Sequence, residues 1–463
     1  MLFTELRFLV FFALVFALYW ALRGNTVRKL FLLAASYLFY AGWDWRFLGL
    51  ILASTLIDYS AGLALGRAAL SAAKRRAWLI ASLIANLGIL GLFKYYDFFV
   101  SSAVELTAWL GLPLSARTLS LTLPVGISFY TFQTLSYTLD VYRNKLAPVS
   151  SFLDFALFVA FFPQLVAGPI VRASTFLPQL GESRLFRDVL VRQQLTLFLV
   201  GYFKKACVAD NLAVAVDPVF AAPAGWSASA LWIAMLLYGI QIYCDFSGYS
   251  DMAIAVAGLL GYQLPLNFYF PYLATTVTEF WRRWHISLST WFRDYLYLPL
   301  GGNRGSAART YLNLATVFVL CGLWHGASWN FVVWGVIHGA LLVGERVTGW
   351  RNRVGLELPG WALTQLCAML AWIPFRTADL ATAGAYWAGL VGSARAPVDH
   401  FPEELGWLLL ALLGLHLATR FGKLTDRFAA LSPALFAPAF GVVVALVLPF
   451  AAADYQPFIY FQF

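Results

Sequence analysis

The sequence predicts an all-α polytopic membrane protein, and three observations carry this prediction. Of the 463 residues, 61% are hydrophobic and 12% are charged, and the mean hydropathy is +0.72. Soluble globular domains balance apolar and charged residues far more evenly. Apolar runs of spanning length recur from Leu2 to Ala453, with short basic clusters between them. We therefore expect a single integral membrane domain over residues 1–463.

The apolar runs predict twelve crossings, uncertain by one or two, and the first of them is expected to be a retained span because no small-residue cleavage site follows it. Basic clusters such as Arg23/Arg28/Lys29 follow the first, third and fifth runs, which places the N-terminus outside the cytoplasm. The expected spans are 2–22, 30–48, 49–66, 77–100, 121–142, 189–208, 228–260, 308–322, 328–345, 360–376, 404–419 and 435–453.

The net charge of +9 reports topology and predicts no nucleic-acid partner, because Lys and Arg lie in short clusters between apolar runs. The four cysteines are scattered inside apolar runs with no C-x-x-C spacing. Neither a metal site nor a disulfide framework is therefore expected.

Two stretches, 153–180 and 265–305, are expected to be embedded in the membrane without spanning it. The first is apolar but is cut by Pro163, Gly168, Pro169 and Pro178, so no unbroken helix can cross there. The second is too charged to span. Irregular backbone at membrane depth is tolerated where protein buries it or where it lines a water-filled cavity.

His325 is the candidate catalytic residue, because it lies among apolar and small residues in the middle of a hydrophobic run. A polar group at that depth is costly and usually functional. Trp324 and Asn330 are expected to line the same chamber. The alternative is a neutral core histidine that is hydrogen-bonded across a helix pair.

Three arginines, Arg282, Arg283 and Arg293, are expected on one amphipathic helix that also carries Glu279 and Ser289 at spacings of three to four. Guanidinium groups pair bidentately with phosphate, so the helix could bind a nucleotide-bearing donor. Contact with lipid headgroups is an equal alternative.

Asp245 and Asp251 form a polar island inside the apolar run 228–260. Intramembrane carboxylates usually face a cavity or a partner. Either they line the chamber or hold the helix of His285, or they serve a purely structural hydrogen-bonding role.

Several motifs together resemble the signature of the membrane-bound O-acyltransferases. The main one reads FWRRWHISLSTWFRDYLYLPLGGNR at 280–304 and is followed by LWHG at 323–326. Within that family, the chain is similar to the bacterial branch that includes the membrane subunit of alginate O-acetylation. Further matches lie at 123–133, 162–170, 243–251 and 458–463.

The resemblance implies a catalytic pair in which His325 takes the position of the family's near-invariant histidine and His285, 40 residues earlier, takes the upstream position. Many eukaryotic members have Asn at that position. It also implies a ring of about 11–12 transmembrane helices around a central tunnel in the bacterial inner membrane. His325 would act as a base or would be transiently acylated, while His285 orients the partner or shuttles a proton.

As the resemblance implies, the donor would be cytoplasmic acetyl-CoA, with no bound cofactor. The acetyl group would pass through a periplasmic SGNH-type acetyltransferase partner to an exopolysaccharide or cell-wall glycan. D-alanyl transfer from a carrier protein is the related alternative. A transporter or a non-catalytic scaffold of an export machine is the third.

Overall fold

The computed structural model describes residues 1–112, 114–350, 357–392, 404–452 and 458–459. Every regular element in these ranges is a helix, which confirms the predicted all-α class. The chain forms two compact units. One comprises Met1–Val189 with Ala257–Pro265, and the other comprises Leu190–Val256 with Leu266–Phe463.

Six helical stretches among the described residues are long and apolar enough to cross a membrane. These are Asn25–Leu65, Ala72–Trp109, Ala228–Leu259, Ala307–His325, Glu357–Arg376 and Pro433–Phe450, and shorter apolar helices cover Leu6–Ala21, Leu380–Val391 and Trp407–Gly422. The chain is therefore a multi-pass membrane protein. The number of crossings stays a prediction.

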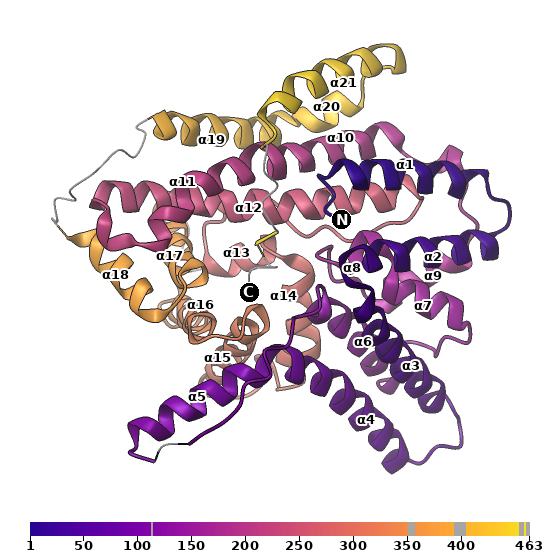
Figure 1. Cartoon of the computed structure of the whole chain (residues 1–463), viewed down its shortest axis with the longest axis horizontal. Coiled ribbons are helices and arrows are strands. Elements are labelled where there is room, and N and C mark those ends of the chain that lie inside the picture. The colour runs from indigo at the N-terminus through magenta and orange to yellow at the C-terminus, as the bar shows by residue number, and fades with distance from the viewer. Residues whose placement is uncertain (113, 351–356, 393–403, 453–457, 460–463) are drawn as a thin grey trace. The chain divides into compact units, whose positions relative to one another are not determined.

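The first unit consists of twelve described helical segments. They are α1 Leu6–Ala21, α2 Asn25–Asp44, η1 Trp45–Phe47, α3 Leu48–Leu65, α4 Ala72–Leu90, η2 Gly91–Tyr95, α5 Tyr96–Trp109, α6 Ile127–Tyr142, α7 Phe152–Ala160, α8 Phe162–Leu165, α9 Ala173–Gly181 and η3 Phe186–Asp188. Figure 1 labels α1 to α9 among them. Helices α3, α4 and α6 pack against one another. Their shared core is polar: Asp58 accepts hydrogen bonds from Ser82 at 2.5 Å, Thr138 at 2.7 Å and Asn86 at 2.8 Å. Such bonds hold membrane helices together where the hydrophobic effect cannot.

The predicted interruption in 153–180 is confirmed, since α7, α8 and α9 are all short. The chain turns at Phe161, whose ψ is 109°, and Pro163 lies in the first turn of α8. The amide of Phe162 donates to the hydroxyl of Ser36 at 3.1 Å, and Gln164 donates to the carbonyl of Phe158 at 2.6 Å. Protein therefore buries this irregular backbone, as the physics of a low-dielectric environment requires.

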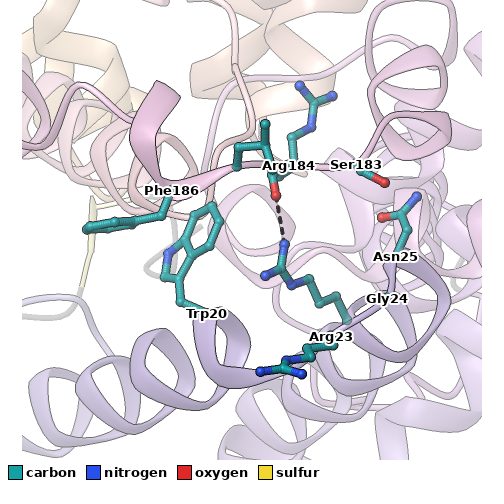
Figure 2. Close-up of a pocket in the computed structure, with 9 residues that line it drawn as sticks. Trp20, Arg23, Gly24, Asn25, Ser183, Arg184 and Phe186 are labelled. Atoms are coloured by element: carbon teal, nitrogen blue, oxygen red, sulfur yellow. Dashed lines mark hydrogen bonds between the residues drawn. The ribbon is translucent and has the colours of Figure 1, made fainter.

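A cavity of about 340 Å³ lies at the junction of α1 and α2 in the first unit. Trp20 and Phe186 lie on one side of it, and Asn25 and Ser183 on the other (Figure 2). Arg28 closes the junction by donating to the carbonyls of Arg184 at 2.7 Å and Leu22 at 3.0 Å. The predicted site residues all lie in the second unit.

The second unit contains the remaining helices. They are α10 Val191–Tyr202, η4 Phe203–Ala209, α11 Asp210–Ala221, η5 Pro223–Gly225, α12 Ala228–Leu259 (its last three residues belong to the first unit), η6 Pro271–Leu273, α13 Val277–Arg283, α14 Ile286–Phe292, η7 Arg293–Tyr297, α15 Ala307–His325, α16 Trp329–Val347, α17 Glu357–Arg376, α18 Leu380–Val391, α19 Glu404–Gly422, α20 Leu424–Ala429, α21 Pro433–Val447 and η9 Leu448–Phe450. Two of these segments, η4 and η7, are π-helical turns, which often occur at functional sites.

Helices α15 and α16 form a tight antiparallel pair, drawn side by side in Figure 1. Glycines permit the close approach. A Cβ atom at Gly335 would lie 2.3 Å from the carbonyl oxygen of Phe318, which no side chain could tolerate. This packing holds the end of α15, where the candidate histidine lies.

Candidate active site

His325 is the last residue of α15 and lies in an aromatic cluster. The helix begins after Ser306, whose hydroxyl accepts the amide hydrogen of Arg309, and ends at the extended backbone of Gly326. The imidazole is buried. Ring centroids lie 4.9 Å away for Trp334, 5.1 Å for Trp324 and 5.3 Å for Phe375. The packing of α15, α16 and α17 thus fixes the ring between large apolar surfaces.

His285 lies at a break between α13 and α14, which corrects one expectation. A single helix was expected to carry Glu279, Ser289 and the three arginines, but the helix stops at Arg283. His285 has a left-handed backbone with φ 43° and ψ 54°. Non-glycine residues adopt this conformation uncommonly. The break turns the imidazole into the interior, where His285 is fully buried.

The two candidate histidines lie close together. The ring centroids of His285 and His325 are 6.4 Å apart, with 53° between the ring planes. Trp324 lies beside both, with its ring centroid 6.0 Å from that of His285. Phe246 of α12 packs edge-on against His285, with ring centroids 4.6 Å apart. The structure therefore joins two imidazoles from distant parts of the sequence in one aromatic environment.

Asn267 contacts His285 and was not expected from the sequence. It lies in the irregular segment between α12 and α13 and is fully buried. Its side-chain oxygen lies 3.1 Å from Nδ1 of His285 and accepts hydrogen bonds from the backbone and hydroxyl of Ser287. One signal was available in the sequence, namely an amide between Pro265 and Pro271 in an otherwise apolar segment.

Asp245 and Asp251 of α12 form ion pairs with two lysines of the π-helical segment η4. Lys205 lies 2.7 Å from Asp245 and 2.6 Å from Asp210, and all three side chains are buried. Lys204 lies 2.7 Å from Asp251. Chamber lining by Asp245 and Asp251, like the purely structural alternative, stays a prediction. Neither lysine was singled out, because partners on two separate helices cannot be matched from a sequence alone.

Asp245 also links the chain's last described residues to the core, because it accepts the amide hydrogen of Ile459 at 2.8 Å. Asn330 has a comparable linking role. Its side chain donates to the carbonyl and hydroxyl oxygens of Thr377 at 2.8 and 3.3 Å, and so connects the start of α16 to the end of α17. Chamber lining by Asn330 stays a prediction.

The three arginines differ in what they contact. Arg283 lies 2.5 Å from Glu279 and Arg293 lies 2.7 Å from Asp294. Arg282 is exposed, with no hydrogen bond or ion pair to another described residue. Because carboxylates compete with phosphate for a guanidinium group, Arg282 is the best placed of the three for an anionic donor. The phosphate role stays a prediction for all three.

Much of the sequence matches a known family of enzymes. A family model described as MBOAT, membrane-bound O-acyltransferase family, matches residues 37–355, which include both histidines and Asn267. The chain belongs to the membrane-bound O-acyltransferase family. The predicted family assignment is therefore confirmed, and the chain is an O-acyltransferase.

Relatives within the membrane-bound O-acyltransferase family differ in the group and acceptor that their names state. A "probable alginate O-acetylase AlgI" of Pseudomonas aeruginosa is 36% identical and covers all of both chains. A peptidoglycan O-acetyltransferase of Helicobacter pylori is 38% identical over 81% of this chain and 76% of its own length. A teichoic acid D-alanyltransferase of Streptococcus thermophilus is 31% identical over 47% of this chain and 56% of its own.

Proposed function

We propose that this membrane-bound O-acyltransferase takes an acetyl group from acetyl-CoA at the cytoplasmic face of the bacterial inner membrane and delivers it to an acceptor on the other side. The observation that carries the proposal is the 6.4 Å approach of the His285 and His325 rings within one buried aromatic cluster. A site closed to water strengthens electrostatic interactions and protects a thioester from hydrolysis.

In the proposed reaction, His325 is the general base. Its imidazole takes the proton of the acceptor hydroxyl, and the freed oxygen forms a bond to the carbonyl carbon of the acetyl thioester. The carbon–sulfur bond then breaks, and the departing CoA thiolate receives a proton from the imidazolium. The products are the acetyl ester and CoA, so no oxidant or further reactant is needed. His285 relays the proton or orients the hydroxyl from the opposite side of the pair.

The final acceptor in this proposal is a glycan, either an exopolysaccharide or a cell-wall polymer. The names of the two acetyltransferase relatives, one for alginate and one for peptidoglycan, support a glycan in general and neither polymer in particular. We include a periplasmic SGNH-type acetyltransferase as the partner that receives the acetyl group first. Its serine would supply the hydroxyl that His325 deprotonates.

D-alanyl transfer is the second candidate, because one relative is named as a teichoic acid D-alanyltransferase. It ranks lower, since that similarity covers 47% of the chain whereas the alginate relative covers all of it.

The test uses inside-out membrane vesicles that contain the full chain and its native neighbours, supplied with acetyl-labelled acetyl-CoA or with a D-alanyl carrier protein. We expect label in glycan from acetyl-CoA only, and about 10²-fold less label, or lower still, in vesicles with His325→Ala. His416→Ala is the matched control, since that ring packs on Phe270 and lies outside the histidine pair. If label reached the glycan from the carrier protein alone, D-alanyl transfer would replace acetyl transfer as the proposed function.

A further inference from the structure

Asn267 is held at four points by His285 and by two serines outside the histidine pair. Its side-chain oxygen meets Nδ1 of His285 at 3.1 Å and accepts from the Ser287 hydroxyl at 2.8 Å and the Ser287 amide at 3.2 Å. Its side-chain nitrogen donates to the Ser250 hydroxyl on α12 at 3.1 Å. A buried amide with this many partners has one orientation and little freedom to leave it.

The bond from Ser287 identifies which atom of Asn267 faces His285. A backbone amide can only donate, so the atom of Asn267 that it meets is the side-chain oxygen. That oxygen can only accept, and therefore Nδ1 of His285 carries the hydrogen. In a neutral imidazole the lone pair then lies on Nε2. The contact thus selects one of the two tautomers of His285.

Asn267 also supports the backbone around His285. The backbone carbonyl of Asn267 accepts the amide hydrogen of Ile286 at 2.9 Å, and its side-chain oxygen accepts the amide hydrogen of Ser287. These two amides belong to the first turn of α14, where the N-cap residue His285 makes no side-chain capping hydrogen bond. The bonds hold the turn at which His285 adopts its left-handed conformation.

We propose that Asn267 is a positioning residue that holds His285 as the Nδ1–H tautomer, with Nε2 as its proton-accepting atom, and fixes the ring beside Trp324 and His325. The inference rests on the proposed role of His285 in acetyl transfer. A carboxylate at this place would stabilise the protonated form of the ring. An uncharged amide orients the ring without doing so. This suits a residue that must both accept and release a proton.

The first test compares Asn267→Leu with Asn267→Asp in full-length protein in membrane vesicles. Leucine removes the acceptor, and we expect kcat to fall by about 10- to 100-fold while KM for acetyl-CoA stays within about twofold. Aspartate keeps an acceptor for Nδ1 of His285. At high pH we therefore expect the kcat of Asn267→Asp to be close to that of the wild type, unlike the kcat of Asn267→Leu. Ser287→Ala is the control, because it removes one partner of Asn267 and leaves the His285 contact in place.

The pH profile separates positioning from support of the fold. A carboxylate at position 267 stabilises the charged imidazolium, so the acid limb of kcat in Asn267→Asp should move to higher pH. The titratable ring that faces His285 from α15 is His325, which is unchanged in both proteins. A profile identical to that of the wild type would overturn the proposal, and this variant decides the question if Asn267→Leu does not fold.

A double variant tests whether Asn267 acts through His285. In a His285→Gln background, Asn267→Leu should cause no further loss of kcat, since the ring that it orients is gone. An equal loss in both backgrounds would show an independent role and overturn the proposal. Full activity of His285→Gln alone would instead remove the role of His285 from the proposed function. If His285→Gln were inactive and Asn267→Leu fully active, the positioning role of Asn267 would be refuted. The proposed role of His285 in acetyl transfer would stand.

Discussion

Gly322 on α15 lies directly against the backbone of Phe331 on α16. A Cβ atom added at Gly322 would stand 2.1 Å from the carbonyl oxygen of Phe331. His325 follows three residues later on α15, and its ring packs on Trp334 of α16. The position of the candidate base therefore depends on a contact that only glycine allows.

The first prediction follows from this contact. Gly322→Ala should force α15 and α16 apart, lower the unfolding free energy by about 1–3 kcal/mol and reduce acetyl transfer, because the backbone carbonyl cannot move aside as a flexible side chain would. Gly344→Ala on α16 is the control, since a Cβ there meets no atom within 4 Å. Thermal unfolding in detergent and acetylation by the same preparations provide the measurement. Equal behaviour of the two variants would contradict the account.

The second prediction concerns the buried ion pairs of η4. Lys205→Met leaves Asp210 and Asp245 buried without their shared cation, and we expect a loss of about 3–5 kcal/mol in unfolding free energy. Arg187→Gln should cause no measurable change, because the Arg187–Asp188 pair is exposed on both sides. Denaturant titration of the two proteins provides the comparison. A silent Lys205→Met would show that the carboxylates do not depend on this cation.

The third prediction ranks two neighbouring arginines. If this face of α13 binds the donor's phosphates, Arg282→Gln should weaken acetyl-CoA binding roughly tenfold, the value of one charge-assisted hydrogen bond. Arg283→Gln should weaken it less, because that guanidinium already pairs with Glu279. Binding to the full chain in detergent measures both. Unchanged affinity in Arg282→Gln would leave contact with lipid headgroups as the role of this residue.

The fourth prediction concerns topology. Because basic clusters follow the first, third and fifth apolar runs, a reporter fused after Arg76 should lie in the cytoplasm and one fused at Met1 outside it. Reporter enzymes active on only one side of the membrane distinguish the two positions. The opposite pair of signals would reverse the orientation and with it the direction of acetyl transfer.

The sequence alone predicted the helical class, the interruptions and the histidine pair. Apolar runs and prolines are local properties, so the break around Pro163 could be located without a structure. His285 and His325 were paired through motifs that resemble a family. Their spacing of 40 residues carries no geometric information without the turn at which α13 ends.

What the sequence did not predict depends on contacts between distant segments. Helical spacing favoured one helix from Glu279 to Arg293, but the amides of Ile286 and Ser287 donate to Asn267 and stabilise a break at His285 instead. The pairing of Lys205 with Asp245 depends on the packing of η4 against α12.

Helix α18 was absent from the predicted spans because its 12 residues are too few to cross a bilayer.

The most direct test of the central claim is the acetyl content of the cell's glycan in a strain whose only copy carries His325→Ala, measured at matched protein level. We expect a loss of about 10²-fold or more, since general acid–base catalysis commonly contributes that much. His285→Asn in the same strain should keep partial activity if the ring only orients the acceptor, and lose it if an imidazole must move a proton. Near-normal acetylation with His325→Ala would contradict the proposed mechanism.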